Sequence, residues 1–196
     1  MRHGQILEHL KSKLVPGQVY RRTDFEANTS NVDRHLATMV AAGVLKKLAH
    51  GLYAAPKSTS FGEAPPDERS LIQSFLKDDH FVVYSFNNFN ALSLGTTQLY
   101  NQTFVFNRKR VGTFKLGWRT YTFHRWREAP KKLTVEFLVV ELMNRLNQLA
   151  ENRDEVVWQL KRKLREFNLK RLKYNLDHYG TVFSQKLFSE LMTESA

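Results

Sequence analysis

The stretch "GVLKKLAHGLYAAP", from Gly43 to Pro56, decides how the first third of the chain is interpreted. Two short apolar runs flank Ala49-His50-Gly51, and the first run carries Lys46 and Lys47. A strand, a turn in which a glycine can take a positive φ, and a returning strand make a β-hairpin. The stretch therefore predicts a hairpin whose apolar side chains are core: Leu45, Leu48, Leu52 and Tyr53.

Three segments before this hairpin have helical patterns. Residues 2–14 repeat leucine and isoleucine at helical spacing, and "VYRRTDFEA" places Thr23 three residues before Glu26, the spacing of a capping box. Ser30 stands three residues before Asp33, which predicts a second capping box and a helix that ends at Gly43. The core stripe of that helix is predicted to be Val32, Leu36, Met39 and Val40. Helix, short helix, turn, helix and hairpin follow the order of a winged helix-turn-helix, predicted over residues 1–58.

The rest of the chain predicts a second domain. The stretch around residues 59–66 is rich in Pro, Gly and Ser and is interpreted as a linker. Residues 67–196 are predicted to start with a helix, followed by the buried strand "HFVVYSF" and a short helix. Two aromatic runs come next and are predicted to be strands of one antiparallel sheet. The chain then ends in helices, with a break after Asn168. In the second aromatic run Gly117 is interpreted as a bulge or as a close approach of the backbone to another part of the chain. We therefore expect an α+β fold, in which the second domain has a small antiparallel sheet and a C-terminal helical bundle.

The composition limits the classes of function. The chain of 196 residues has 30 Lys and Arg against 19 Asp and Glu, a formal net charge of +11. Residues 1–58 hold nine of these cations against four anions, so the surplus is densest there. Such a charge attracts polyanions, among which are nucleic acids, acidic proteins and anionic membranes. No secretory signal or window of transmembrane length is present, and a cytoplasmic protein without membrane attachment is expected.

An enzymatic function is not expected. The chain has no cysteine, its seven histidines are scattered, and no metal-binding or nucleotide-binding motif is present. Asp78 and Asp79 fall between a predicted helix and a predicted strand, where such residues usually turn the chain. We therefore expect no catalytic residue, no metal and no cofactor.

The predicted winged helix places a set of polar side chains where duplex DNA would bind. The third helix would direct its first turn at the major groove, where Arg can recognise guanine and Asn can recognise adenine. Hydroxyl groups near its start and the arginines before the second helix would contact phosphates, and the basic residues of the hairpin would lie at the next groove. The candidate DNA-binding residues are Arg21, Arg22, Thr29, Ser30, Asn31, Arg34, His35, Thr38, Lys46, Lys47 and His50.

Other interpretations stay open at this point. Arg34 alone is consistent with a solvated charge, and Lys46 and Lys47 with protection of an edge strand. The chain is also consistent with a protein-interaction module, a stand-alone regulator or an RNA-binding protein. Basic residues around 161–173 are predicted to share a helix face, which is either solvated, a second DNA contact or a site for an acidic partner.

Three stretches resemble one family, the AbiE-type antitoxins and transcriptional regulators of type IV toxin–antitoxin systems. They are "LATMVAAGVLKKLAHGLYAAP", "VVYSFNNFNALSLG" and "YNQTFVFNRKR" with "GTFKLGWRTYTFHRW". The resemblance extends to about residue 127 and involves no catalytic motif. It implies a winged helix that binds operator DNA and represses its own operon, and a C-terminal domain that counteracts a nucleotidyltransferase-like toxin. In this family the toxin is a genetic partner, and its direct binding is left open.

Overall fold

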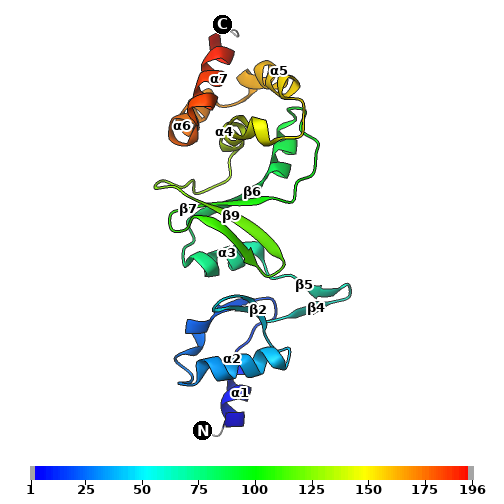
Figure 1. Cartoon of the computed structure of the whole chain (residues 1–196), viewed down its shortest axis with the longest axis vertical. Helices are drawn as coiled ribbons and strands as arrows, with labels where there is room; N and C mark the ends of the chain where they lie inside the picture. Colours follow the sequence, from blue (N-terminus) through cyan, green and yellow to red (C-terminus); the bar gives the residue numbers. More distant parts are fainter. Residues whose placement is uncertain (1–2, 194–196) are drawn as a thin grey trace. The chain divides into compact units, whose positions relative to one another are not determined.

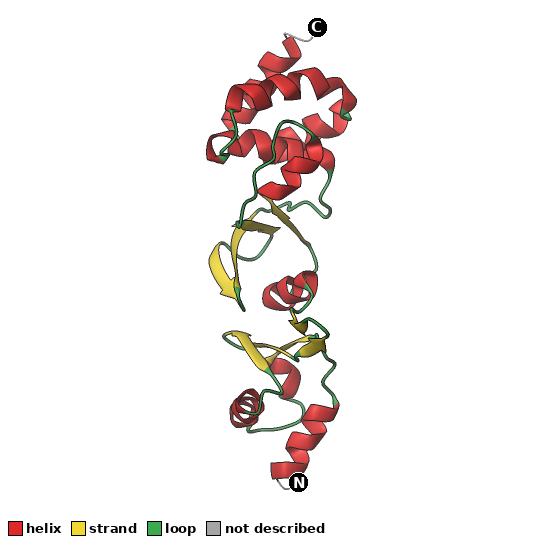
Figure 2. Ribbon diagram, turned by 90° about the vertical axis from the view of Figure 1, so that its right-hand side faces the viewer, coloured by secondary structure: helices red, strands yellow, loops and turns green. Residues whose placement is uncertain are grey.

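The computed structural model describes residues 3–193 as a mixed α/β protein with small antiparallel sheets (Figures 1 and 2). The chain divides into two compact units. The first unit runs through Asp79 and also contains Thr113–Tyr121, and the second contains His80–Gly112 and the chain from Thr122 onward. This division differs from the predicted boundary at residues 58–67, because the helix after the predicted linker belongs to the first unit.

The first unit contains the elements predicted before and within the hairpin, together with three short strands that were not predicted. The elements are α1 (His3–Ser12), β1 (Val19–Arg21), the 3₁₀ helix η1 (Arg22–Phe25), α2 (Val32–Ala41), β2 (Lys46–Ala49), β3 (Leu52–Ala54), β4 (Lys57–Thr59), β5 (Gly62–Ala64) and α3 (Glu68–Leu76). The three strands that were not predicted are β1, β4 and β5. Strand β3 lies between β1 and β2 in a three-stranded antiparallel sheet. The stretch predicted as one short helix is therefore a strand followed by a single 3₁₀ turn.

The helix α2 follows the predicted core stripe. Its residues Val32, Leu36 and Met39 are buried and pack with Leu10 of α1 and Leu45. Gly43 has a φ of 70°, and Val44 N–H donates to the carbonyl of Met39 at 2.9 Å, as in a helix that ends at a glycine. The start was predicted wrongly, because the N-cap is Asn31 and not Ser30. Thr29 sets this turn instead, since its hydroxyl accepts from Asn31 N–H at 3.1 Å.

The hairpin between β2 and β3 confirms the prediction from the opening stretch. Lys47 pairs with Tyr53, Ala49 pairs with Leu52, and a bulge lies between Lys47 and Ala49. The turn uses Gly51 at a φ of 65°, a conformation that favours glycine. Leu48, Leu52 and Tyr53 are buried as predicted.

Two predicted segments have more structure than expected. Residues 59–66 were interpreted as a linker, but β4 and β5 form an antiparallel hairpin in which Thr59 pairs with Gly62. The run around Gly117 was interpreted as one strand with a bulge or a close approach at this glycine, but it is two strands, β8 (Gly112–Leu116) and β9 (Arg119–Arg125). The close approach is present, because a Cβ at Gly117 would lie 3.3 Å from Leu48 Cδ2. Gly117 has a φ of 64° and forms the turn between them, and its N–H donates to the carbonyl of Leu48 at 2.8 Å. This turn belongs to the first unit.

The second unit contains strands followed by helices. Its other elements are β6 (Phe81–Ser85), η2 (Phe86–Leu92), β7 (Thr103–Asn107), α4 (Val135–Arg145), η3 (Leu146–Gln148), α5 (Arg153–Lys163), η4 (Leu164–Glu166), α6 (Leu169–Tyr179) and α7 (Val182–Thr193). In the sheet of this unit β7 lies between β6 and β9. Aromatic side chains of the strands pack against the nearly all-buried helix α4, and α4 contacts α6 and α7. Each unit therefore contains a buried apolar cluster among the described residues.

The predicted break after Asn168 is confirmed, and it changes the interpretation of the basic residues around it. Asn168 caps α6 by accepting from Arg171 N–H at 3.0 Å. Because α5 ends at Lys163 and α6 begins at Leu169, the basic residues of 161–173 lie on two helices and not on one face. Across residues 3–193, no helix has both the length and the apolar composition that a bilayer crossing requires.

Candidate nucleic-acid interface

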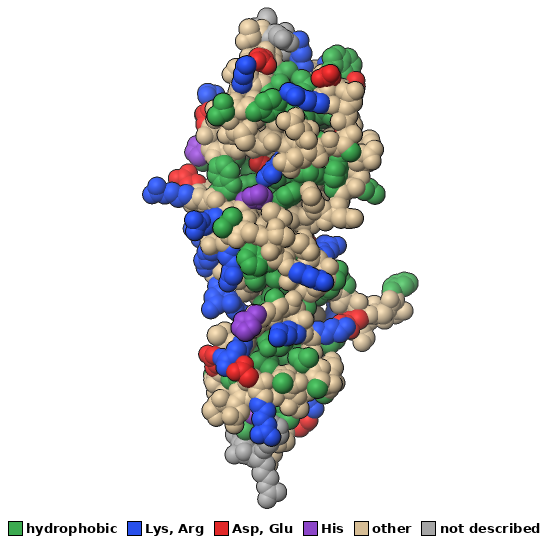
Figure 3. Space-filling view, viewed as in Figure 1, with side chains coloured by type: hydrophobic (Ala, Val, Ile, Leu, Met, Phe, Trp, Pro, Cys, Tyr) green, Lys and Arg blue, Asp and Glu red, His purple; other side chains and the backbone are tan. Residues whose placement is uncertain are grey.

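The helix α2 and the β2–β3 hairpin enclose a cleft of about 740 Å³ in the first unit. Its lining combines apolar side chains, such as Val40 and Tyr53, with charged ones. The residues that line it are Arg22, Asp33, Ala37, Val40, Ala41, Lys47, His50, Gly51 and Tyr53. On the face shown in Figure 3, Lys, Arg and His side chains lie over the region of α2 and β2, with Asp and Glu side chains beside them. The cleft therefore joins three of the predicted contact residues from separate segments: Arg22, Lys47 and His50.

Arg22 is fixed at this cleft by its backbone and by its side chain. Its N–H donates to the carbonyl of Gly51 at 2.9 Å, which attaches η1 to the hairpin turn. Its guanidinium donates to both oxygens of Asp33, from Nε at 2.7 Å and from Nη2 at 2.9 Å, and its Nη1 donates to Glu26 at 2.5 Å. Sequence reasoning placed Arg22 at a phosphate, whereas in the structure two carboxylates hold it.

Asp33 is correspondingly ionised. The hydrogen bonds from Arg22 hold the pKa of the Asp33 carboxyl below its ordinary value, and the charges of Arg22 and His50 add to this effect. The sequence predicted Asp33 as a capping-box carboxylate, but its partner is a side chain eleven residues earlier. No local spacing rule reveals a pair of this kind, since it depends on how η1 packs beside α2.

The outer face of α2 carries three of the predicted base-contact residues. Asn31, Arg34 and Thr38 are exposed, and their spacing of three and four residues places them on one side of the helix. The Thr38 hydroxyl donates to the carbonyl of Arg34 at 2.9 Å. This face presents an amide and a guanidinium to solvent without an apolar side chain between them.

His35 does not belong to this face, which corrects the prediction. Its side chain is only 2% exposed and packs inside the unit, with Nδ1 lying 3.0 Å from the Thr29 hydroxyl. A sequence signal for this burial existed, because residue 35 follows Val32 by three and precedes Met39 by four, as a core position does. The same contact occupies the Thr29 hydroxyl, so neither side chain is presented to a phosphate. Ser30 remains exposed.

The other predicted residues lie around the cleft or away from it. Lys46 is exposed but forms an ion pair of 2.6 Å with Glu63 of β5. Arg21 is half-buried and lines a different cleft, where Asp24, Asp78 and Asp79 are also found. The structure thus brings together α2, η1 and the hairpin turn at one cleft, whereas Arg21, the N-cap residue of η1, lines the other.

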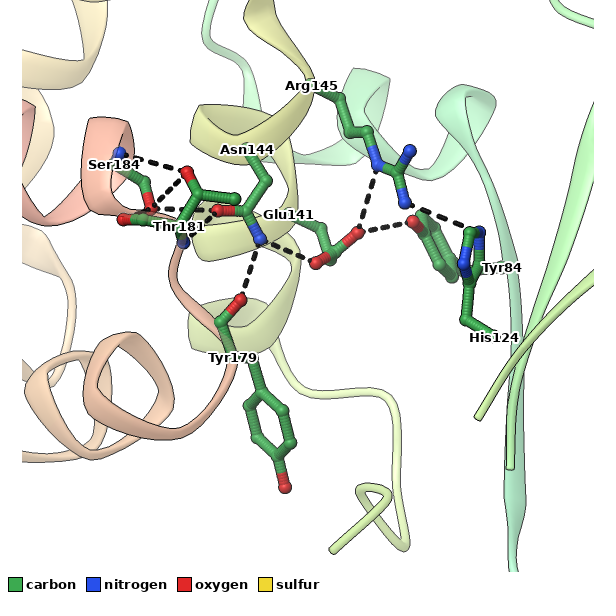
Figure 4. Close-up of polar contacts among 8 residues, drawn as sticks. All are labelled: Tyr84, His124, Glu141, Asn144, Arg145, Tyr179, Thr181 and Ser184. Carbon is green, nitrogen blue, oxygen red and sulfur yellow. Dashed lines mark hydrogen bonds and ion pairs between the residues drawn. The ribbon is translucent and has the colours of Figure 1, made fainter. Parts of the chain in front are cut away.

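The second unit contains a buried polar network that sequence reasoning missed (Figure 4). Glu141 on α4 is 1% exposed; it accepts from the Tyr84 hydroxyl at 2.5 Å and from Asn144 at 2.8 Å, and Arg145 Nε lies 3.5 Å away. Burial raises the pKa of Tyr84, and burial followed by the nearby charge of Arg145 lowers the pKa of His124. The network is enclosed between α4 and the strands, a position that fits a structural role.

A search of residues 3–193 finds no group of three or more His, Asp or Glu side chains placed to hold a metal ion. Comparison of the sequence with known protein families gives no match, and a search of curated proteins finds no significant relative. The functional assignment therefore depends on the residues of the site and on the resemblance described above.

Proposed function

We propose that the first unit is a winged helix-turn-helix that binds duplex DNA, and that the chain is a transcriptional repressor and an antitoxin of a type IV toxin–antitoxin system. The proposal is supported above all by the exposed face of α2 that carries Asn31, Arg34 and Thr38, on a helix that shares a cleft with the β2–β3 hairpin. In this proposal the protein is cytoplasmic and acts by binding DNA and not by catalysing a reaction.

The geometry favours DNA over a generic polyanion because the polar face belongs to a helix. An α-helix fits the major groove, where a guanidinium can donate two hydrogen bonds to guanine and an amide can pair with adenine. The hairpin carries the exposed residues Lys47 and His50 next to this helix, in the position from which a wing would reach the sugar–phosphate backbone. The surplus of cations in residues 1–58 supports association with DNA at long range.

The antitoxin part of the proposal depends on the family resemblance alone. It gives the second unit the task of counteracting a nucleotidyltransferase-like toxin encoded beside this protein. The test is to express that neighbouring gene with and without this chain and to measure growth. Continued growth arrest in the presence of this protein would contradict the antitoxin role and would leave the DNA-binding role intact.

The DNA-binding part is tested by titrating the full chain against its own upstream duplex and a scrambled duplex of equal length. Arg34→Ala should weaken binding to the upstream duplex by about tenfold or more and reduce the preference over the scrambled one, since a base contact contributes about 1–3 kcal/mol of discrimination. Lys186→Ala is the matched control, because Lys186 is an exposed cation on α7. Absence of binding at low salt, or equal effects of both substitutions, would contradict the proposal.

A further inference from the structure

A second cleft, of about 650 Å³, lies entirely within the second unit. Four parts of the chain line it: the segment from Arg127 to Thr134 that precedes α4, His80 before β6, Arg108 after β7, and residues of α6. Its volume falls in the range of pockets that hold small-molecule ligands. Neither the DNA-binding proposal nor the family resemblance assigns a role to it.

The chain segment that forms one wall is held in place by two hydrogen bonds. His80 Nε2–H donates to the carbonyl of Ala129 at 2.6 Å, and the Tyr179 hydroxyl donates to the carbonyl of Glu128 at 2.8 Å. Ala129 and Pro130 are buried between these anchors. The cationic side chains that follow therefore extend from a fixed backbone, which reduces the entropy lost when a ligand binds.

The wall is strongly cationic. Four cations are exposed: Arg127, Lys131, Lys132 and Arg171. Within residues 3–193 the charged group of none of the four forms an ion pair or a hydrogen bond. Arg108 adds a fifth cation to the rim. The lining contains a single carboxylate, that of Glu128, which lies 3.9 Å from His178 Nε2. Cations gathered around a concave surface repel each other, and a multiply charged anion removes this repulsion.

One wall of the cleft is a flat aromatic ring. Tyr174 on α6 lines the cleft and is 55% exposed, and its ring stacks on that of His178, with ring centroids 4.0 Å apart. The His178 Nδ1–H donates to the carbonyl of Tyr174 at 2.8 Å, which fixes the stacked pair. Exposed aromatic rings next to cations are the usual platform on which a nucleobase stacks while its phosphates bind basic groups.

We propose that this cleft binds a nucleoside polyphosphate. The phosphates contact the cations Lys131, Lys132 and Arg171, and the base stacks on Tyr174. A bare polyanion would use the cations alone, so the exposed ring distinguishes a nucleotide from inorganic phosphate. The proposal is independent of DNA binding by α2, because every residue involved belongs to the second unit.

The test is isothermal titration calorimetry of the full chain with ATP, GTP and inorganic triphosphate. The variant that combines Lys132→Ala with Arg171→Ala should weaken the binding of all three by at least about tenfold, because it removes two charge-assisted contacts. Tyr174→Ala should weaken the binding of the two nucleotides by about tenfold and leave inorganic triphosphate unchanged, since stacking involves the base only. Lys186→Ala and Arg34→Ala should change none of these affinities. Circular dichroism checks that each variant is folded.

Several results would overturn the proposal. One is the absence of any heat of binding at millimolar nucleotide. Another is that Tyr174→Ala lowers the affinity for inorganic triphosphate as much as the affinity for nucleotides. A third is that nucleotide affinity disappears in Arg34→Ala. Binding of RNA or DNA oligonucleotides without binding of mononucleotides would assign the cleft to nucleic acid instead. None of these outcomes affects the test of the operator duplex with Arg34→Ala, so failure of one proposal is distinguishable from failure of the other.

Discussion

Replacing Asp33 by asparagine is expected to strengthen DNA binding. The Asp33 carboxylate stands in the first turn of α2 and accepts two hydrogen bonds from Arg22, at 2.7 and 2.9 Å. In the proposed complex it repels nearby phosphates and also occupies a guanidinium that could neutralise one. Asparagine keeps the size of the side chain and removes its charge, so of the two carboxylates that hold Arg22 the one of Glu26 remains.

The magnitude follows from counterion release. Each phosphate that a cation neutralises adds about 0.9 to the slope of the logarithm of affinity against the logarithm of salt concentration. If Arg22 gains one phosphate, the slope becomes steeper by about 0.9. The advantage of Asp33→Asn over the native chain should then decrease by about threefold between 50 and 200 mM salt.

Fluorescence anisotropy with the labelled upstream duplex, at three salt concentrations in that range, measures both quantities. Glu190→Gln is the matched control, because Glu190 is an exposed carboxylate on α7 that lies 4.0 Å from Lys186. An unchanged or weaker affinity for Asp33→Asn would refute the placement of α2 at the DNA. An equal gain in the Glu190→Gln control would show that net charge alone is responsible.

Three further predictions concern the stability of the two units. Glu141→Leu should lower the free energy of unfolding, measured by urea titration, by about 3 kcal/mol. The reason is that it leaves Arg145 and the Tyr84 hydroxyl buried without their acceptor. Glu141→Gln should lower the free energy of unfolding by less. Because the pKa of His124 is lowered in the folded state, the unfolded chain binds more protons than the folded chain at the same pH. The free energy of unfolding should therefore fall from pH 7 to pH 5, by no more than about 1.4 kcal/mol per pH unit. His124→Phe should reduce this slope. Gly43→Ala should lower the free energy of unfolding by about 1 kcal/mol, because alanine is strained at a φ of 70°. Thermal melts measure this change, and an unchanged melting temperature would contradict it.

Hydrophobic periodicity predicted the helices and the first hairpin well, because burial of one face is their main source of stability. The stripe of α2 and its end at Gly43 are present as predicted, and so is the break after Asn168. The strand β1 was missed because it is three residues long and exists only through its pairing with β3. Short strands of this kind have little intrinsic preference and depend on a partner that the local sequence does not reveal.

The candidate site was predicted less completely than the fold. Exposure of Asn31, Arg34 and Thr38 followed from their position opposite the core stripe. The burial of His35 was missed because a polar residue at a core position was interpreted by its type and not by its spacing. The pairs of Arg22 with Asp33 and of Lys46 with Glu63 connect different elements, so they could be found only in the folded chain.

The turn at Gly117 limits how this protein can be divided or synthesised. The first unit takes Thr113–Tyr121 from a distant part of the sequence, and Gly117 N–H donates to Leu48 while the Tyr121 hydroxyl donates to Glu68 at 3.2 Å. A fragment that stops near residue 79 therefore lacks part of its own structure. During translation the proposed DNA-binding unit cannot be completed until residue 121 has left the ribosome, long after its other elements have been made.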